Sequence, residues 1–164
     1  MIVAELNGMD RDRFVQALGW IFEESPWVAE RAWDTRPFAD LEALHRQMTS
    51  VVTGATREEQ VALLRAHPDL GARAKMSNAS VGEQAGAGLD RLSPDDFDRL
   101  QRLNSAYRAK FGFPFLYAVK GSTSKQILDA LDERLLHDPD DEFREALRQV
   151  ERIARFRLET LVVG

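Results

Sequence analysis

His67 is the residue of this sequence best placed for acid–base chemistry. It is the last residue before Pro68, at the end of an apolar helical segment, and a residue before proline is held away from helical geometry. An imidazole at such a fixed boundary is suited to act as a positioned acid or base near neutral pH. The other two histidines favour structural roles. His45 lies near an apolar stripe, and His137 precedes Asp138 at a helix C-terminus, where it interacts with the helix dipole.

The segment from Ser80 to Leu89 combines a carboxylate with an unusual number of glycines. Ser80 and Glu83 have the spacing of a capping box, which by itself favours a structural role for Glu83. Each glycine in a short helix costs about 0.5–1 kcal/mol relative to alanine, and this segment holds three: Gly82, Gly86 and Gly88. The glycine spacing therefore predicts that backbone or ligand approaches closely on this side of the helix.

Arg157 lies on the apolar flank of the last predicted helix, beside Val150 and Leu161. One interpretation is that the aliphatic part of its side chain lies along the edge of the core while the guanidinium reaches solvent or pairs with a carboxylate. The position of Arg157 alone favours this interpretation. Alternatively, the guanidinium points into a cleft and holds a planar anionic ligand bidentately.

The aromatic cluster over residues 111–115 also allows two interpretations. It is either core or the apolar wall of a site beside exposed backbone N–H groups.

Helical spacing of apolar residues runs through nearly the whole chain, and these helices must position the candidate side chains. Helix-start signals precede most of the segments, at Asp10, Asp40, Thr56 with Glu59, Ser80, Ser93 with Pro94, and Asp138 with Pro139. Residues 116–119 are the one strand-like stretch, and they are too few to pair alone. We therefore expect an all-α fold, a compact single-domain bundle of about seven to eight helices over residues 1–164.

The composition excludes several classes of protein. The 164 residues carry a net charge of −5, which argues against nucleic acid as a partner, because a nucleic-acid binder needs a basic surface. The absence of cysteine excludes disulfides and thiolate nucleophiles, and three scattered histidines argue against a metal site. No apolar run approaches the ~20 residues that span a bilayer, and neither end carries a secretion or peroxisomal signal. We expect a cytoplasmic protein with no membrane partner.

Four motifs stand in a specific order along the chain. They are His67-Pro68-Asp69-Leu70, Ser80-x-x-Glu83-Gln84-x-x-Ala87-Gly88-Leu89, Asn104-x-x-Tyr107-x-x-Lys110-Phe111-Gly112-Phe113-Pro114-Phe115 and Ile153-Ala154-x-x-Arg157-Leu158. Ser25-Pro26-Trp27-Val28-Ala29 and Arg36-Pro37-Phe38 precede them. Together these motifs resemble the 2-oxo-4-hydroxy-4-carboxy-5-ureidoimidazoline (OHCU) decarboxylases of the ureide pathway, over about residues 7–158. Any one motif is weak, whereas their agreement in order over one chain is specific.

The resemblance implies conversion of OHCU, an oxidation product of urate, into (S)-allantoin and CO₂. It also implies an all-α protein that is usually a homodimer and uses no metal or organic cofactor. The substrate's own chemistry accounts for the missing cofactor. The carboxylate of OHCU sits on a carbon next to a ring C=N, as in a β-imino acid, so the electrons released with CO₂ can flow into the imine. The protein must then orient the carboxylate and deliver a proton to one face of the intermediate.

The resemblance further implies which residues form the site. His67 and Glu83 are the expected catalytic residues, near the departing carboxylate and the new stereocentre. Either His67 acts on the substrate hydroxyl, or its protonated form donates to carbon while Glu83 sets its charge. The expected substrate-binding residues are Pro68, Ser80, Gln84, Phe115, Leu116 and Arg157.

The binding residues have separate expected roles. Gln84 is expected to bond the ureido or ring amides, and Arg157 a carbonyl or anionic oxygen. Backbone N–H groups near Phe115 and Leu116 are expected to bind a ring carbonyl. Ser80 either contacts substrate or only caps its helix.

Two other functions stay open. A non-enzymatic helical interaction module would use His67, Glu83 and Arg157 for capping and packing and would leave them far apart. The enzyme instead predicts one concave site lined by these three residues and Phe115. The second alternative is a family member that decarboxylates a related ureide or imidazoline acid, because a change of substrate needs no change of motif.

Overall fold

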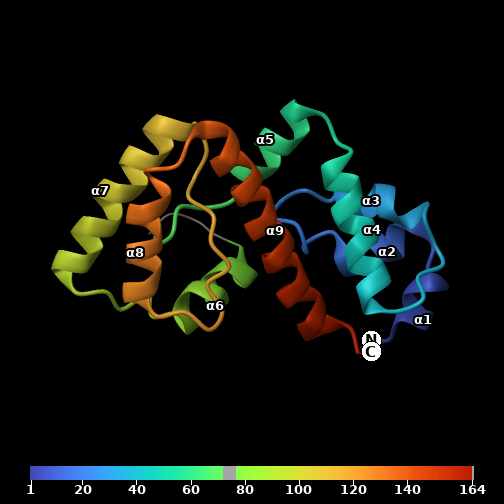
Figure 1. Cartoon of the computed structure of the whole chain (residues 1–164). Helices are drawn as coiled ribbons and strands as arrows, with labels where there is room; N and C mark the ends of the chain where they lie inside the picture. Colours follow the sequence, from blue (N-terminus) through green and yellow to red (C-terminus); the bar gives the residue numbers. More distant parts are fainter. Residues whose placement is uncertain (72–76, 164) are drawn as a thin grey trace. The chain divides into compact units, whose positions relative to one another are not determined.

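Helices make up most of the part of the chain that the structure describes. The structure is a computed structural model, and it describes residues 1–71 and 77–163. In these ranges the helices are α1 (Val3–Asn7), α2 (Arg11–Leu18), α3 (Trp27–Trp33), α4 (Leu41–Thr53), α5 (Arg57–Arg65), α6 (Asn78–Gly86), α7 (Pro94–Phe111), α8 (Ser124–Arg134) and α9 (Pro139–Leu161) (Figure 1). The all-α expectation is confirmed. Among the described residues the helices number nine, of which α1 is the shortest at five residues.

Helices α5 and α7 begin at the signals that the sequence predicts. At the start of α5, the Glu59 N–H donates to Thr56 Oγ1 at 3.1 Å, and the Thr56 N–H donates to Glu59 Oε1 at 3.1 Å. Ser93 is the N-cap of α7, and Pro94 is its first residue. These starts follow the sequence because a cap satisfies the first backbone N–H groups of its own helix and needs no distant partner.

Helix α6 begins earlier than the sequence predicts. Its N-cap is Ser77, whose Oγ accepts a hydrogen bond from the Ser80 N–H at 3.2 Å. The predicted capping box of Ser80 and Glu83 is therefore wrong, because Ser80 already lies inside the first turn. The Ser80 hydroxyl does not cap α6.

The chain forms two compact units, which we describe separately. The first comprises residues 1–66 and 151–164, and in it α3 packs against both α2 and α4. Its buried residues include Phe14, Leu18, Phe22, Leu44, Met48, Leu63 and Leu158. The two ends of the chain meet in this unit through an isolated backbone bridge between Ile2 and Val163 (Figure 1).

The second unit comprises residues 67–150, with α6, α7, α8 and the first part of α9. Helix α7 packs against α8, and the chain between them is irregular over residues 112–123. Tyr107 of α7 is fully buried, and its ring centroid lies 4.6 Å from that of Phe111 and 5.5 Å from that of Phe115. The irregular segment is therefore part of the core of this unit.

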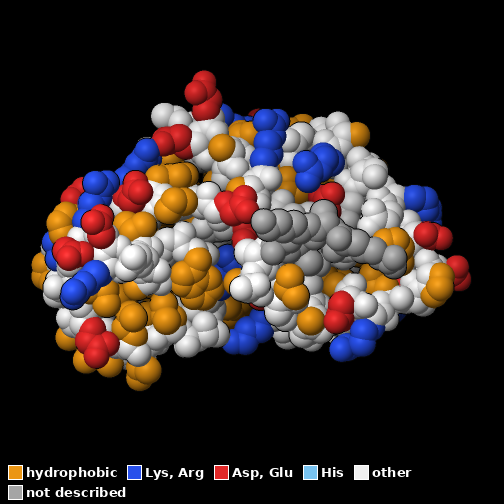
Figure 2. Space-filling model, turned by 180° about the vertical axis from the view of Figure 1, so that it is seen from behind, with side chains coloured by type: hydrophobic (Ala, Val, Ile, Leu, Met, Phe, Trp, Pro, Cys, Tyr) orange, Lys and Arg blue, Asp and Glu red, His pale blue; other side chains and the backbone are white. Residues whose placement is uncertain are grey.

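The surface mixes charges of both signs. On the face seen in Figure 2, acidic and basic side chains are interspersed with hydrophobic ones. None of the helices in the described ranges is long and apolar enough to cross a membrane.

Candidate functional site

His67 lies just beyond the end of α5, as its place before Pro68 predicts. Helix α5 ends at Arg65, Ala66 is its C-cap, and His67 follows in a bend. The His67 side chain is only 6% exposed. A polar ring that is buried to this degree has a restricted orientation, which is what a positioned acid or base requires.

The backbone that follows His67 is tied to two helices. Asn104 of α7 donates from Nδ2 to the Leu70 carbonyl at 2.9 Å. The Gly71 N–H donates to Gln84 Oε1 of α6 at 2.8 Å. Gly71 has φ +70°, a left-handed conformation that favours glycine. These bonds fix the turn after Pro68 and bring Gln84 beside it.

Helix α6 carries three predicted site residues on neighbouring turns. Ser80 and Gln84 are both about 5% exposed and lie four residues apart, so they share the buried face of the helix. Glu83 is half-buried at the edge of that face. Gln84 Oε1 accepts from the Gly71 N–H, so this bond fixes the orientation of the Gln84 side chain.

The prediction of a close approach beside the glycines of α6 is wrong for the described backbone and stays a prediction for a ligand. A Cβ added at Gly82 or Gly86 would meet no described atom within 4 Å. Neither glycine therefore marks a close approach of the described protein backbone. Gly88, beyond the end of α6, has φ +80°, so a glycine is favoured there by the turn itself.

Phe115 and Leu116 lie in the irregular segment after α7, and both are buried. Gly112 ends α7 with φ 81°, which turns the chain into this segment. Arg134 Nη1, from the end of α8, donates to the Leu116 carbonyl, and its guanidinium carbon lies 4.6 Å from the centre of the Phe115 ring. The sequence did not single out Arg134, because its partners are distant in the chain.

Arg157 belongs to the other compact unit, where it forms a buried ion pair. Its Nη2 donates to Glu23 Oε2 at 3.0 Å, and both side chains are only 3% exposed. Nη1 lies 3.2 Å from the Trp20 carbonyl oxygen and 3.3 Å from that of Ile21. Pairing with a carboxylate, one of the two explanations open from the sequence, is therefore present, and its partner Glu23 was missed. Contact of Arg157 with substrate stays a prediction.

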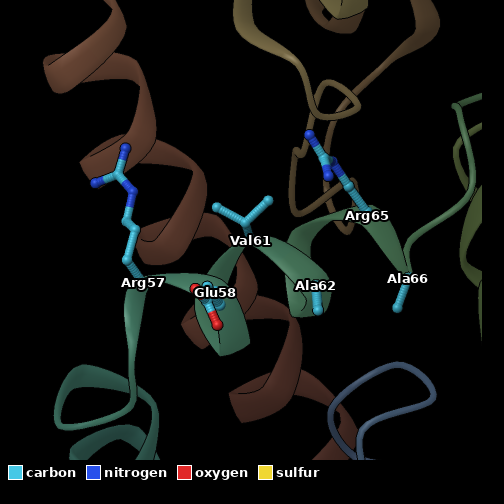
Figure 3. Close-up of a pocket in the computed structure, with 6 residues that line it drawn as sticks. All are labelled: Arg57, Glu58, Val61, Ala62, Arg65 and Ala66. Atoms are coloured by element: carbon cyan, nitrogen blue, oxygen red, sulfur yellow. The ribbon is translucent and has the colours of Figure 1, made fainter.

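A groove of about 580 Å³ runs along α5 (Figure 3). Its lining consists of Arg57, Glu58, Val61, Ala62, Arg65 and Ala66, so it includes none of the predicted site residues. In the described ranges, no group of three or more His, Asp or Glu side chains is placed to hold a metal ion. The predicted site residues other than Arg157 all belong to the unit of residues 67–150.

Comparison with known proteins shows what the whole chain is similar to. The sequence profile of the family described as "OHCU decarboxylase" matches residues 7–159. The chain is 47% identical to the 2-oxo-4-hydroxy-4-carboxy-5-ureidoimidazoline decarboxylase of Halalkalicoccus jeotgali, covering 99% of this chain and 93% of that protein. It is 48% identical to the enzyme of the same name from Haloferax volcanii, covering 96% and 94%. The crystal structure of an (S)-allantoin synthase superposes with a TM-score of 0.80 at 30% identity, over 99% of this chain and 54% of the solved one.

Proposed function

The chain belongs to the OHCU decarboxylase family, and from this premise we propose that it converts OHCU into (S)-allantoin and CO₂ in urate degradation. The observation that carries the proposal is the match over residues 7–159, with relatives that share almost their whole length with this chain. The motifs that contain His67, Glu83 and Arg157 all fall inside the matched range.

The reaction needs an electron sink and a stereospecific proton transfer. When the bond to the carboxylate breaks, its electron pair forms a C=C bond and the ring imine nitrogen takes a proton. The resulting enol regains a carbonyl as its hydroxyl proton leaves and a new C–H bond forms on the carbon that bears the ureido group. The substrate holds the sink, so the protein has to supply orientation and protons.

We assign the proton transfers to His67 and Glu83. His67 is buried, and the turn after it is tied to Asn104 and Gln84. Glu83 directly precedes Gln84 on α6, so the same bond to Gly71 links the helix of Glu83 to the turn of His67. Either His67 acts on the substrate hydroxyl, or His67 in its protonated form donates to carbon while Glu83 sets its charge.

The remaining predicted residues hold the substrate. Gln84, which is held at the turn after Pro68 by the Gly71 N–H, bonds the ureido or ring amides of the substrate. Ser80 lies on the same buried face and contacts substrate. Pro68 borders the bound ring. Backbone N–H groups at Phe115 and Leu116 bind a ring carbonyl.

Arg157 holds a carbonyl or anionic oxygen of the substrate, a role that its motif inside the family match supports. We also propose that residues 1–164 act as one domain, and that the protein is a cytoplasmic homodimer. The family match over residues 7–159 supports the single domain.

The decisive experiment follows the handedness of the product. OHCU decays without enzyme, so product yield alone is ambiguous. OHCU is therefore generated freshly, and allantoin formation is followed by circular dichroism. We expect (S)-allantoin at a rate above the background. Racemic product at the background rate would refute the proposal and favour the interaction module, whereas preference for another ureide acid at saturating concentration would favour the alternative substrate.

Variants test the residue roles. His67→Ala and Glu83→Ala are expected to fold and to lose at least about 100-fold in kcat, because general acid–base catalysis contributes about 10²–10⁴-fold. His45→Gln and Glu58→Ala are the matched controls, since His45 is bonded to the Glu151 carbonyl and Glu58 is exposed on α5. A folded His67→Ala or Glu83→Ala protein with an unchanged rate would remove that residue from catalysis.

A further inference from the structure

A buried polar cluster lies behind the Phe115–Leu116 segment. Its centre is Glu142 of α9, which is 0% exposed. Glu142 Oε1 accepts from the Tyr107 hydroxyl at 2.5 Å and from Arg134 Nε at 2.6 Å, and Arg134 Nη2 also pairs with it. Its other oxygen lies 3.1 Å from His137 Nδ1. Three helices thus converge on one buried carboxylate.

Stability alone is a poor explanation for this cluster. Removing two charges from water costs several kcal/mol, and replacing a buried ion pair by apolar residues of similar volume is often neutral or stabilising. What the pair supplies instead is geometry, because the planar guanidinium presents its donors in fixed directions. Arg134 uses these directions for two tasks. Nε and Nη2 face Glu142, and Nη1 donates to the Leu116 carbonyl.

Arg134 contacts the segment on both sides of one peptide bond. Its guanidinium carbon lies 4.6 Å from the centre of the Phe115 ring, which precedes the Phe115–Leu116 peptide. Its Nη1 bonds the carbonyl of Leu116, which follows that peptide. The Phe115–Leu116 peptide is planar and has one soft dihedral on each side, ψ of Phe115 and φ of Leu116, so contacts on both flanks restrict the direction of the Leu116 N–H. This N–H is one of the donors assigned to the substrate carbonyl.

We propose that Arg134, held by Glu142 and Tyr107, is a positioning residue that presents the Leu116 N–H to substrate. The inference rests on the proposed function, since it needs OHCU to bind at this backbone. Arg134 touches no reacting atom. It acts on substrate binding through the backbone, and its loss raises KM more than it lowers kcat.

Arg134→Lys tests the inference. Lysine keeps a positive charge beside Glu142 but cannot donate at once in the two directions that the guanidinium uses, from Nε to Glu142 and from Nη1 to the Leu116 carbonyl. We expect KM for OHCU to rise about tenfold, the effect of losing one well-placed hydrogen bond, while kcat changes less than about threefold. In the ligand-free protein, we expect the Leu116 amide hydrogen to exchange with solvent faster than in the wild type.

Two controls separate positioning from general weakening. Arg99→Lys makes the same exchange at an exposed pair with Asp132, which joins α7 to α8. We expect its KM to equal that of the wild type. Ile127→Ala creates a cavity at a buried position two turns before Arg134 on α8. It is expected to lower the melting temperature without changing Arg134 itself, so it controls for a general loss of stability.

The outcomes distinguish the inference from the proposed function. A wild-type protein that gives no (S)-allantoin from OHCU refutes the function. If the wild type is active, two results refute the inference. The first is an Arg134→Lys protein with the KM of the wild type and the same exchange rate of the Leu116 amide hydrogen. The second is an Ile127→Ala protein whose KM rises as much as that of Arg134→Lys when both lose the same amount of melting temperature. If Arg134→Lys does not fold, Tyr107→Phe replaces it, because it removes one support of Glu142 and keeps the ring. Its KM is then expected to rise about threefold, and an unchanged KM refutes the inference.

Discussion

The buried pair of Glu23 and Arg157 provides a quantitative test of this structure. Nη2 of Arg157 lies 3.0 Å from Glu23 Oε2, and each side chain is 3% exposed. Glu23→Gln keeps the size of the side chain and one acceptor oxygen but removes the negative charge. Arg157 then carries an uncompensated charge in a site from which water is largely excluded, which is the costly outcome for a buried ion pair.

The expected magnitude follows from the surroundings of Arg157. Breaking a buried ion pair by removing one partner costs about 3–5 kcal/mol. The Trp20 and Ile21 carbonyls still accept from Nη1, and glutamine still offers an oxygen, so we expect the lower end, about 3 kcal/mol. For a protein of this size, 1 kcal/mol shifts the melting temperature by about 2–4 °C, so Glu23→Gln should melt roughly 6–12 °C lower.

The neighbouring pair of Arg155 and Glu42 is the matched control. Arg155 lies two residues earlier on α9, its Nη1 is 2.7 Å from Glu42 Oε2, and the Glu42 side chain is 64% exposed. An exposed pair contributes about 0.2–1 kcal/mol, so Glu42→Gln should melt no more than roughly 4 °C lower. The two variants differ mainly in the burial of the carboxylate that they neutralise.

Thermal and urea unfolding, followed by far-ultraviolet circular dichroism, measure both losses. The double variant Glu23→Gln/Arg157→Met should be more stable than Glu23→Gln alone, because it removes the uncompensated charge. If Glu23→Gln loses no more stability than Glu42→Gln, the burial of this pair has been overestimated. If the double variant is less stable than Glu23→Gln, the uncompensated charge is not the cause of the loss.

Three further predictions concern stability. Burial, followed by the hydrogen bond to Glu142, raises the pKa of Tyr107, so the contribution of Tyr107 to stability is complete below pH 10 and is lost as the pH rises further. Tyr107→Phe should cost about 1–3 kcal/mol at neutral pH and should lose less stability than the wild type at alkaline pH, measured by urea unfolding. An equally steep alkaline loss in the variant would contradict this prediction. The hydrogen bond from Arg31 lowers the pKa of Glu59 from 4.5 to about 2, so the stability of the wild type should fall as the pH falls through this range. The stability of Glu59→Gln should fall less over the same range. Equal losses of stability in the two proteins would refute this. Gly71→Ala should lose about 1–2 kcal/mol in urea unfolding, because φ is +70° and the new Cβ would lie 2.5 Å from a leucine side-chain carbon; wild-type stability would show that this turn relaxes freely.

Local signals predicted the longer helices well. The capping box at Thr56 and Glu59 and the Ser93–Pro94 start are both present, because they involve residues three apart within one helix turn. The short helices α1 and α3 were not predicted individually, since five or seven residues contain too few turns to show an apolar period. At α6 the N-cap is Ser77, three residues before the predicted Ser80.

The sequence by itself determined the helical character of the chain, the place of His67 at a helix end and the family to which the motifs point. These depend on spacing along the chain. Only the tertiary structure decided which side chains are held by which partners. Glu23 pairs with Arg157 from 134 positions away, and Tyr107 meets Glu142 from 35 positions away. Such partners leave no periodic trace in a sequence, because a side chain reaches a distant neighbour only after the helices between them have packed.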